Sequence, residues 1–343
     1  MRLATPRWWY VRGRQPMPVT RALLRPLSWL WAWTTARRLR GAVGVDPGAP
    51  VICIGNLTLG GSGKTPVVRA LAGWFAERGR AVHIVSRGHG GRLAGPVRVD
   101  PAVHTAADVG DEPLMMAAGA PVWVARNRAA ASLAAAEAGA QVIVMDDGFQ
   151  NPAVRKSLSL LVVDGETRGD EWPFGDGSVF PSGPMREPLK AGLARADAVV
   201  VLLPADLPRA DADLMALFAP TPVLIAHLLP VGPPPAGPLL AFAGIGKPWK
   251  MERALRAAGA DLVDFAPLPD HAAPSQSTLR FLAARARALG AGLITSEKDW
   301  ARLTPLWRAR VASWPVRAVF DDPEALDRLL SLATAPTAGR PAP

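Results

Sequence analysis

Short runs of apolar residues alternate with alanine-rich stretches along the first two thirds of the chain. The apolar runs contain many β-branched residues and predict strands at 51–54, 82–85, 122–124, 142–145, 159–163 and 198–203. The alanine-rich stretches predict helices at 64–78, 112–118, 126–138 and 209–218. This alternation is typical of an α/β protein in which helices cover a parallel sheet.

A proline-rich section from Pro220 to Pro238 interrupts this rhythm and is interpreted as a linker. Beyond it, strands near 239–242, 262–265, 293–295 and 316–320 predict a second, smaller α/β domain. The tail after Leu332 is rich in Ala, Pro and Thr and is expected to be disordered. We therefore expect an arm at 1–40, a core domain at 41–226, a smaller domain at 227–332 and a tail at 333–343.

The net charge of +10 is concentrated in the first forty residues, which hold nine arginines and no acidic residue. The rest of the chain is nearly neutral. The arm also contains the only tyrosine, Tyr10, and five tryptophans: Trp8, Trp9, Trp29, Trp31 and Trp33. Because the positive charge comes with a tryptophan-rich apolar surface, the arm does not resemble a nucleic-acid-binding patch.

Helical spacing in the arm separates apolar from polar positions. One side collects Leu23, Leu27, Leu30 and Trp31, and another collects Arg21, Arg25 and Ser28. Pro26 is expected to kink this helix or to mark its start. The pattern predicts an amphipathic helix on the surface of an anionic membrane, because its apolar stretch of about fourteen residues is too short to span. The alternative is a helix packed on the protein's own core.

Composition adds two expectations. A chain of 343 residues is long enough for two domains. Cys53 is the only cysteine, so an intramolecular disulfide is impossible and a reducing cytosol is the expected environment.

A phosphate-binding loop follows the apolar run at 51–54 directly. Its glycines allow the backbone N–H groups to point inward, Lys64 reaches the phosphates, and the Thr65 hydroxyl coordinates Mg²⁺. The strict pattern has Gly where this chain has Thr58, and a merely structural turn is the alternative. We expect eight residues to bind ATP: Thr58, Leu59, Gly60, Gly61, Ser62, Gly63, Lys64 and Thr65.

Two carboxylates, Asp146 and Asp147, follow the apolar run at 142–145. The carboxyl ends of parallel strands face the ligand crevice, so these side chains are expected near the nucleotide's Mg²⁺. Adjacent residues of an extended strand point in opposite directions, so one carboxylate should serve the metal and the other a neighbour. An Asp-Asp-Gly turn without function is the alternative.

Other motifs are weaker individually. Arg87 lies in a glycine-rich loop suited to phosphate, and Asp111 stands at a helix start, where it could simply be a cap. Arg186 and Glu187 lie in a proline-bounded loop, and His271 follows Asp270.

Read in order, these motifs resemble the tetraacyldisaccharide 4'-kinase family. The resemblance covers roughly residues 18–305 and rests on six phrases: Gly55-Asn56-Leu57-Thr58-Leu59-Gly60-Gly61-Ser62-Gly63-Lys64-Thr65-Pro66, Ser86-Arg87-Gly88, Gly110-Asp111-Glu112-Pro113, Asp146-Asp147-Gly148-Phe149-Gln150, Arg186-Glu187-Pro188 and Asp270-His271. His89 departs from the pattern, because the family usually has Tyr after Ser-Arg-Gly.

The resemblance implies a P-loop kinase that uses Mg-ATP on a lipid A precursor, at the cytosolic face of the bacterial inner membrane. The acceptor is the 4'-hydroxyl of a tetraacylated glucosamine disaccharide 1-phosphate, and a monomer is expected. The implied catalytic residues are Asp111, His271, Lys64, Asp146 and Arg186; Thr65, Asp147 and Glu187 are the implied metal ligands, and Arg87 and Arg128 candidate phosphate contacts. Asp111 and His271 are implied to form an acid–base pair, without deciding which accepts the proton.

Two other classes compete with the kinase. A membrane-associated ATPase of the deviant-Walker type needs a signature lysine before the first glycine, where this chain has Leu59. A nucleotide switch without enzymatic activity would need neither Asp111 nor His271. The kinase is therefore the favoured interpretation.

Overall fold

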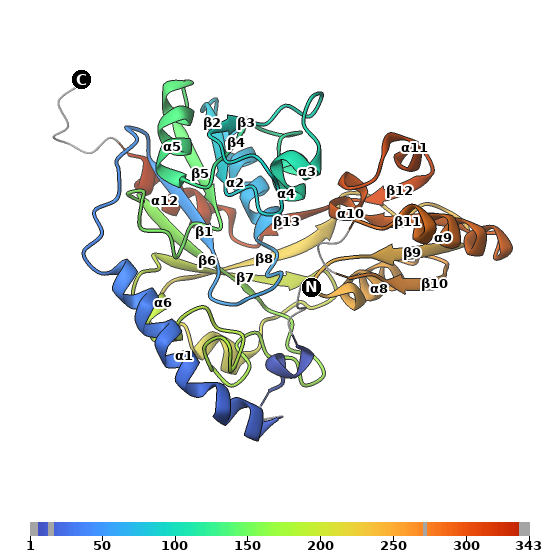
Figure 1. The fold of residues 1–343 in the computed structure, drawn as a ribbon, viewed down its shortest axis with the longest axis horizontal. Helices are drawn as coiled ribbons and strands as arrows, with labels where there is room; N and C mark the ends of the chain where they lie inside the picture. Colours follow the sequence, from blue (N-terminus) through green and yellow to red (C-terminus); the bar gives the residue numbers. More distant parts are fainter. Residues whose placement is uncertain (1–5, 13–16, 270–272, 336–343) are drawn as a thin grey trace.

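The computed structural model describes residues 6–12, 17–269 and 273–335. Among these residues, nine strands form a large sheet in the order β13-β8-β7-β6-β1-β5-β2-β4-β3, and four form a smaller sheet in the order β10-β9-β11-β12 (Figure 1). The expected α/β class with a second, smaller sheet is confirmed.

The large sheet is mostly parallel. Its strands are β1 (Val51–Gly55), β2 (Val82–Ser86), β3 (Val97–Arg98), β4 (Val122–Val124), β5 (Val142–Asp146), β6 (Leu158–Asp164), β7 (Ala198–Pro204), β8 (Val223–Pro230) and β13 (Val316–Phe320). Only the edge pairings β3–β4 and β13–β8 are antiparallel. Every residue of β1 and β5 is buried, as expected for central strands covered on both faces. The six strands expected before residue 204 are confirmed.

Helices and one 3₁₀ helix accompany the large sheet: η1 (Arg7–Tyr10), α1 (Pro18–Leu39), α2 (Lys64–Glu77), α3 (Ala106–Val109), α4 (Asp111–Met116), α5 (Arg128–Glu137), α6 (Leu189–Leu193), α7 (Ala212–Ala216) and α12 (Pro323–Thr334). The four helices expected from alanine-rich stretches are present. The helix expected at 209–218 is shorter, because the Asp211 side chain caps it by accepting hydrogen bonds from the backbone N–H groups of Asp213 and Leu214.

The smaller sheet contains β9 (Leu239–Ala243), β10 (Leu262–Pro267), β11 (Gly292–Ser296) and β12 (Val311–Trp314), with helices α8 (Pro248–Ala257), α9 (Gln276–Ala288), α10 (Glu297–Ala301) and α11 (Pro305–Arg308). Its strand pairings are parallel. We call these elements, residues 239–314, the small lobe and the other described elements the large lobe. In Figure 1 the small lobe lies beside one end of the large sheet.

The interpretation of residues 220–238 as a linker is wrong, because β8 lies within this section and pairs with β7. Its prolines lie outside the interior of β8: Pro222 precedes the strand, Pro230 ends it, and Pro233, Pro234 and Pro235 lie in the loop before β9, so no missing N–H interrupts the middle of the ladder. The boundary expected after residue 226 falls inside β8. The strand expected at 316–320 exists, but β13 returns to the large sheet and pairs with β8 rather than joining the small lobe.

Helix α1 is continuous from Pro18 to Leu39 with Pro26 inside it, so the proline neither starts nor ends the helix. Its buried side chains are polar: Arg21, Ser28 and Thr35. Its large apolar side chains are exposed to solvent: Val19, Leu23, Leu27, Trp29, Leu30, Trp31 and Trp33. Within the described ranges, no helix combines the length and apolar character needed to cross a bilayer. The expected helix therefore exists, and these apolar side chains lie on its outward side.

Candidate active site

The phosphate loop connects β1 to α2 in the middle of the large sheet, where β1 pairs with β5 and β6. Gly63 precedes the helix with φ 76°, a conformation that L side chains rarely adopt. A Cβ atom at this position would also lie 2.3 Å from Cδ2 of Leu202. The loop thus favours glycine here for its backbone turn, while the contact with the end of the Leu202 side chain could be relieved by a shift of that side chain.

Contacts from two distant segments hold the loop. The Leu59 N–H donates to the carbonyl of Pro184 at 2.8 Å, and the Tyr10 hydroxyl donates to the Leu59 carbonyl. The Thr58 carbonyl accepts a hydrogen bond of 3.1 Å from Nε of Arg186. The sequence motif predicts the loop, but only the fold shows that Tyr10 and the 184–186 segment fix its shape.

Two cations converge on Asp147 at the amino end of α2. The Lys64 ammonium lies 3.4 Å from Oδ1 of Asp147, and a guanidinium nitrogen of Arg186 lies 3.0 Å from the same oxygen. Burial would raise the pKa of Asp147, but the charges and hydrogen bonds of Lys64 and Arg186 lower it below its usual range. The structure therefore brings together three of the predicted site residues around an ionised carboxylate.

Asp146 points to a different environment, as expected for adjacent residues at a strand end. Its carboxylate is buried and accepts a hydrogen bond of 3.2 Å from the Ser86 hydroxyl. Burial raises the pKa of Asp146 to about 7, helped by the nearby charges of Glu112 and Asp147. Asp147 therefore loses its proton more readily than an ordinary aspartate, and Asp146 loses its proton less readily.

Glu187 is buried behind the loop and is already engaged by its neighbours. Its carboxylate accepts a hydrogen bond of 3.0 Å from Nε2 of Gln150 and pairs with the Arg195 guanidinium. No group of three or more His, Cys, Asp or Glu side chains arranged to hold a metal ion occurs in the part of the chain that the structure describes. Both Glu187 and Asp147 are paired with cations, but the Glu187 side chain is 4% exposed and that of Asp147 is 37% exposed.

Asp111 begins α4 and faces the small lobe. Its carboxylate accepts a hydrogen bond of 2.9 Å from Nε of Arg302, which follows α10. Lys298 lies 3.9 Å from the same carboxylate and 3.0 Å from Oε1 of Glu112. The expected partner His271 lies outside the described residues, as does Asp270.

The two candidate phosphate arginines differ in exposure. Arg128, the first residue of α5, is buried, and one of its guanidinium nitrogens donates to the Ala125 carbonyl at 2.9 Å. Burial lowers the pKa of Arg128, while the charges of Asp146 and Asp147 oppose that shift. Arg87 is exposed, and its positive charge also acts on Arg128. Both arginines therefore belong to the region around the paired aspartates.

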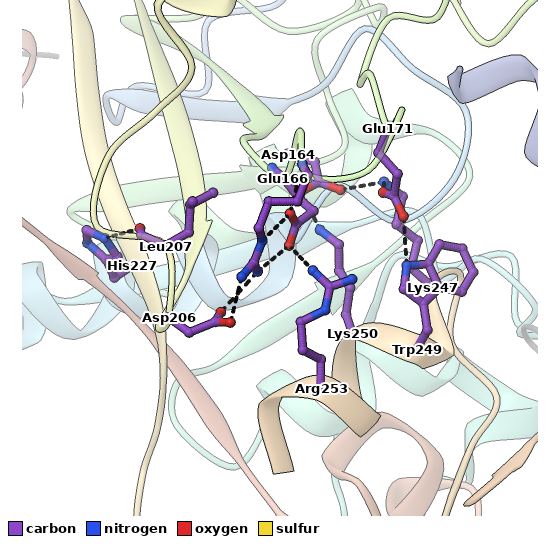
Figure 2. Close-up of polar contacts among 11 residues, drawn as sticks. Asp164, Glu166, Glu171, Asp206, Leu207, His227, Lys247, Trp249, Lys250 and Arg253 are labelled. Carbon is purple, nitrogen blue, oxygen red and sulfur yellow. Dashed lines mark hydrogen bonds and ion pairs between the residues drawn. The ribbon is translucent and has the colours of Figure 1, made fainter. Parts of the chain in front are cut away.

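A cavity of about 630 Å³ lies between the phosphate loop and the small lobe. Residues 58–62 form one wall, and Ile245, Lys247, Trp249, Leu268 and Pro269 of the small lobe form another. Tyr10 and the loop after β6 complete it. Figure 2 shows the charged side chains beside this cavity, with Lys247, Lys250 and Arg253 from α8 facing Asp164, Glu166 and Glu171.

Comparison with known proteins identifies the family. The tetraacyldisaccharide-1-P 4'-kinase family model matches residues 20–334. The chain belongs to this family. The tetraacyldisaccharide 4'-kinase of Phenylobacterium zucineum is 66% identical over 330 residues, which cover 96% of this chain and 99% of that protein. The corresponding kinase of Caulobacter vibrioides is 64% identical, covering 96% of this chain and 98% of that relative.

A solved structure supports the fold. The crystal structure of LpxK from Aquifex aeolicus in complex with ATP aligns with a TM-score of 0.72 at 24% sequence identity. The alignment covers 92% of this chain and 99% of that protein. The likeness therefore includes both lobes, since it extends over nearly the whole length of each chain.

Family membership confirms the resemblance drawn from the six phrases, but several residues at the site carry no short motif. Tyr10 contacts the phosphate loop from 49 residues away, and Arg302 reaches Asp111 across 191 residues. In the sequence, Tyr10 was noticeable only as a member of the tryptophan-rich arm, which was expected at the surface. No pattern indicated its contact with the phosphate loop. For Lys247 and Arg302 no local pattern distinguishes them from solvent-exposed cations.

Proposed function

We propose that this protein transfers the γ-phosphoryl group of ATP to the 4'-hydroxyl of a tetraacylated glucosamine disaccharide 1-phosphate, a step of lipid A biosynthesis. Membership of the tetraacyldisaccharide 4'-kinase family supports the substrate and the reaction. The single structural observation that carries the proposal is the convergence of Lys64 and Arg186 on Asp147 beside the phosphate loop.

The roles follow from charge and position. The loop N–H groups, the amino end of α2 and the Lys64 ammonium would hold the ATP phosphates. Arg186, which contacts both Asp147 and the Thr58 carbonyl, is placed to stabilise charge on the transferring phosphoryl group. Arg128 and Arg87 remain candidates for a further phosphate contact.

The donor set fits Mg²⁺. This ion keeps several waters and usually takes one or two carboxylates together with substrate phosphates, so a full cage of protein ligands is not required. Thr65 and the ionised carboxylate of Asp147 would supply the protein oxygens, with Asp146 close by. When bound, Mg²⁺ would neutralise charge on the phosphate oxygens. We assign Glu187 a supporting role among the metal ligands, because its side chain is buried, whereas that of Asp147 is 37% exposed.

The acceptor hydroxyl needs a proton acceptor, and Asp111 is the proposed candidate together with His271. Asp111 stands at the boundary between the lobes, where Arg302 fixes its carboxylate. A base at this boundary could meet a sugar hydroxyl that enters between the lobes, opposite the phosphate loop. Whether Asp111 accepts the proton or orients His271 distinguishes two versions of the same mechanism.

Helix α1 is the proposed contact with the membrane that holds the lipid substrate. Its exposed leucines and tryptophans would enter the interface, and its arginines would attract anionic headgroups. Holding enzyme and lipid on one surface raises their effective concentration. The cytosolic face of the inner membrane, where ATP is available, is the proposed location.

A kinase assay tests the proposal. The purified protein is incubated with γ-labelled ATP, Mg²⁺ and tetraacyl disaccharide 1-phosphate in detergent micelles. The expected result is label in the lipid that disappears in Lys64→Ala but persists in Lys190→Ala, which changes an exposed lysine of α6. ATP hydrolysis without lipid labelling by folded protein would contradict the proposal and favour a membrane-associated ATPase.

A further inference from the structure

A cluster of six charged residues joins the two lobes beside the cavity, and we call it the interlobe junction (Figure 2). Three carboxylates come from the end of β6 and the loop after it, and three cations come from α8 and the residue before it: Asp164, Glu166, Glu171, Lys247, Lys250 and Arg253. The paired residues are 76 to 87 positions apart in the sequence.

Lys247 pairs with two carboxylates of the junction. Its ammonium lies 2.9 Å from a carboxylate oxygen of Asp164 and 2.9 Å from one of Glu171. The indole N–H of Trp249 donates to the other Glu171 oxygen at 2.8 Å. The first turn of α8 is therefore attached to the large lobe at two separate carboxylates.

Burial makes these pairs stronger constraints than surface ion pairs. The Asp164 side chain is 11% exposed and pairs with both Lys247 and Lys250, whereas the Glu166 side chain, 1% exposed, pairs with Arg253 at 2.8 Å and also with Arg168 of its own lobe. If α8 moved away, Asp164 would lose both cations and be left desolvated and uncompensated, which is strongly unfavourable, while Glu166 would keep Arg168. Moving α8 away from the large lobe would therefore require water to replace several contacts at once.

The junction also reaches the phosphate loop. The Lys247 ammonium lies 5.5 Å from the ring centre of Tyr10, within the range of a cation–π contact. The hydroxyl of the same Tyr10 donates to the Leu59 carbonyl. Tyr10 thus connects Lys247 with the backbone of the phosphate loop. Tyr10, Lys247 and Leu59 all line the cavity.

The small-lobe segment at 268–269 lies on the same cavity wall as α8. A rotation of the small lobe would change the separation between this segment and residues 58–62 of the loop. We propose that the interlobe junction holds the two walls of the cavity in register, and that Lys247 is the positioning residue linking it to the phosphate loop. This inference rests on the proposed kinase function, because it assigns these residues a role in phosphoryl transfer.

The first test measures the arrangement of the lobes directly. Spin labels are placed at Arg80→Cys in the large lobe and Arg280→Cys in α9, both exposed positions, while the buried Cys53 stays unlabelled. We expect one narrow distance distribution in the otherwise unchanged protein and a broader, shifted one in Lys247→Met. The matched control is Arg285→Met, because Arg285 pairs with Asp264 inside the small lobe. Equal distributions in Lys247→Met and the parent would overturn the proposal.

The second test separates positioning from stability. Lys247→Met is expected to lower kcat at saturating ATP by roughly tenfold or more, since misplacement of about 1 Å can cost a hundredfold. Arg285→Met should leave kcat unchanged. An increase in the KM for ATP with an unchanged distance distribution would overturn the proposal, because Lys247 would then act as a nucleotide ligand.

Tyr10→Phe keeps the proposal testable if Lys247→Met does not fold. This variant retains the ring and every ion pair and removes only the hydroxyl that donates to Leu59. Tyr10→Phe alone is expected to lower kcat with an unchanged melting temperature, and an unchanged kcat would overturn the link to the loop. Where Lys247→Met folds, its effect should be smaller in combination with Tyr10→Phe than alone, and additive effects would also overturn that link. If the parent protein labels no lipid, the kinase proposal fails, while the distance measurement still reports on the junction.

Discussion

Helices α1 and α2 each carry both apolar and polar residues. Helix α2 packs apolar residues against the protein, whereas α1 packs polar ones. Helix α2 buries its apolar residues in the core beneath the large sheet: Val67, Val68, Leu71, Ala72 and Phe75. Helix α1 buries Arg21, Ser28 and Thr35 and leaves its leucines and tryptophans exposed. Amphipathic periodicity therefore locates a helix but does not say which side meets the protein.

The contacts of α1 explain its reversed orientation. The buried Arg21 pairs with the carboxylate of Asp176, and the hydroxyls of Ser28 and Ser182 lie 2.6 Å apart. The indole N–H of Trp31 donates to the carbonyl of Arg186 at 3.1 Å. Specific polar contacts thus attach α1 to the segment that carries Arg186. The side chains of Leu23, Leu27, Trp29, Leu30 and Trp33 on the opposite side remain exposed.

The largest expected effect separates the chemical role of α2 from the surface role of α1. Lys64→Ala removes the cation at the amino end of α2 that pairs with Asp147. We expect lipid phosphorylation to fall by at least about a hundredfold, because this charge acts directly on the transferring group. Binding to anionic vesicles, measured by co-sedimentation, should not change. A parallel loss of vesicle binding would show that the two helices do not act independently.

Truncating one aromatic side chain in each helix tests which side is core. Phe75 in α2 is 1% exposed, whereas Trp33 in α1 is 56% exposed. Phe75→Ala should lower the free energy of unfolding by about 3–5 kcal/mol, and Trp33→Ala by less than about 0.5 kcal/mol. Urea denaturation without lipid measures both. A comparable loss in Trp33→Ala would mean that α1 packs its apolar side against the protein.

Prediction from sequence succeeded where a local pattern of residues determines the structure. Strands β1, β2 and β4 to β7 and the loop before α2 were predictable, because local apolar runs and the Gly-Lys-Thr signal determine them, whereas the two-residue edge strand β3 was not predicted. The linker at 220–238 was wrong because proline content alone does not show that the strand between Pro222 and Pro230 can still pair. Long-range contacts such as that of Arg302 with Asp111 leave no local pattern.

The comparison can be sharpened by removing the apolar side of α1. Leu23, Leu27 and Leu30 are more than half exposed, so a triple change to Ser should leave the fold intact. Each leucine contributes up to about 1.5–3 kcal/mol when fully buried, so partial insertion of three predicts at least a tenfold weaker vesicle affinity. Leu306→Ser, at an equally exposed leucine of α11, serves as the control and should not change the affinity.

Retention of vesicle affinity by the triple variant would assign membrane attachment to the arginines alone. High salt would then abolish binding, because exposed charges are screened beyond roughly 10 Å at 0.1 M ionic strength. Substantial binding that persists at high salt in the unchanged protein, and is lost in the triple variant, would instead support insertion of the apolar side.

The smallest expected effect concerns the polar side of α1 and its dependence on pH. Burial would raise the pKa of Asp176, but the Ser178 N–H and Arg21 lower it overall. Because the folded-state pKa lies below the unfolded value near 4, this contact stabilises the protein above about pH 4 and is lost as the pH falls through the folded value. Arg21→Gln should therefore lower the melting temperature more at pH 7 than at pH 3, by about 2 °C. Equal decreases at the two pH values would show that Arg21 supports α1 by packing rather than by charge.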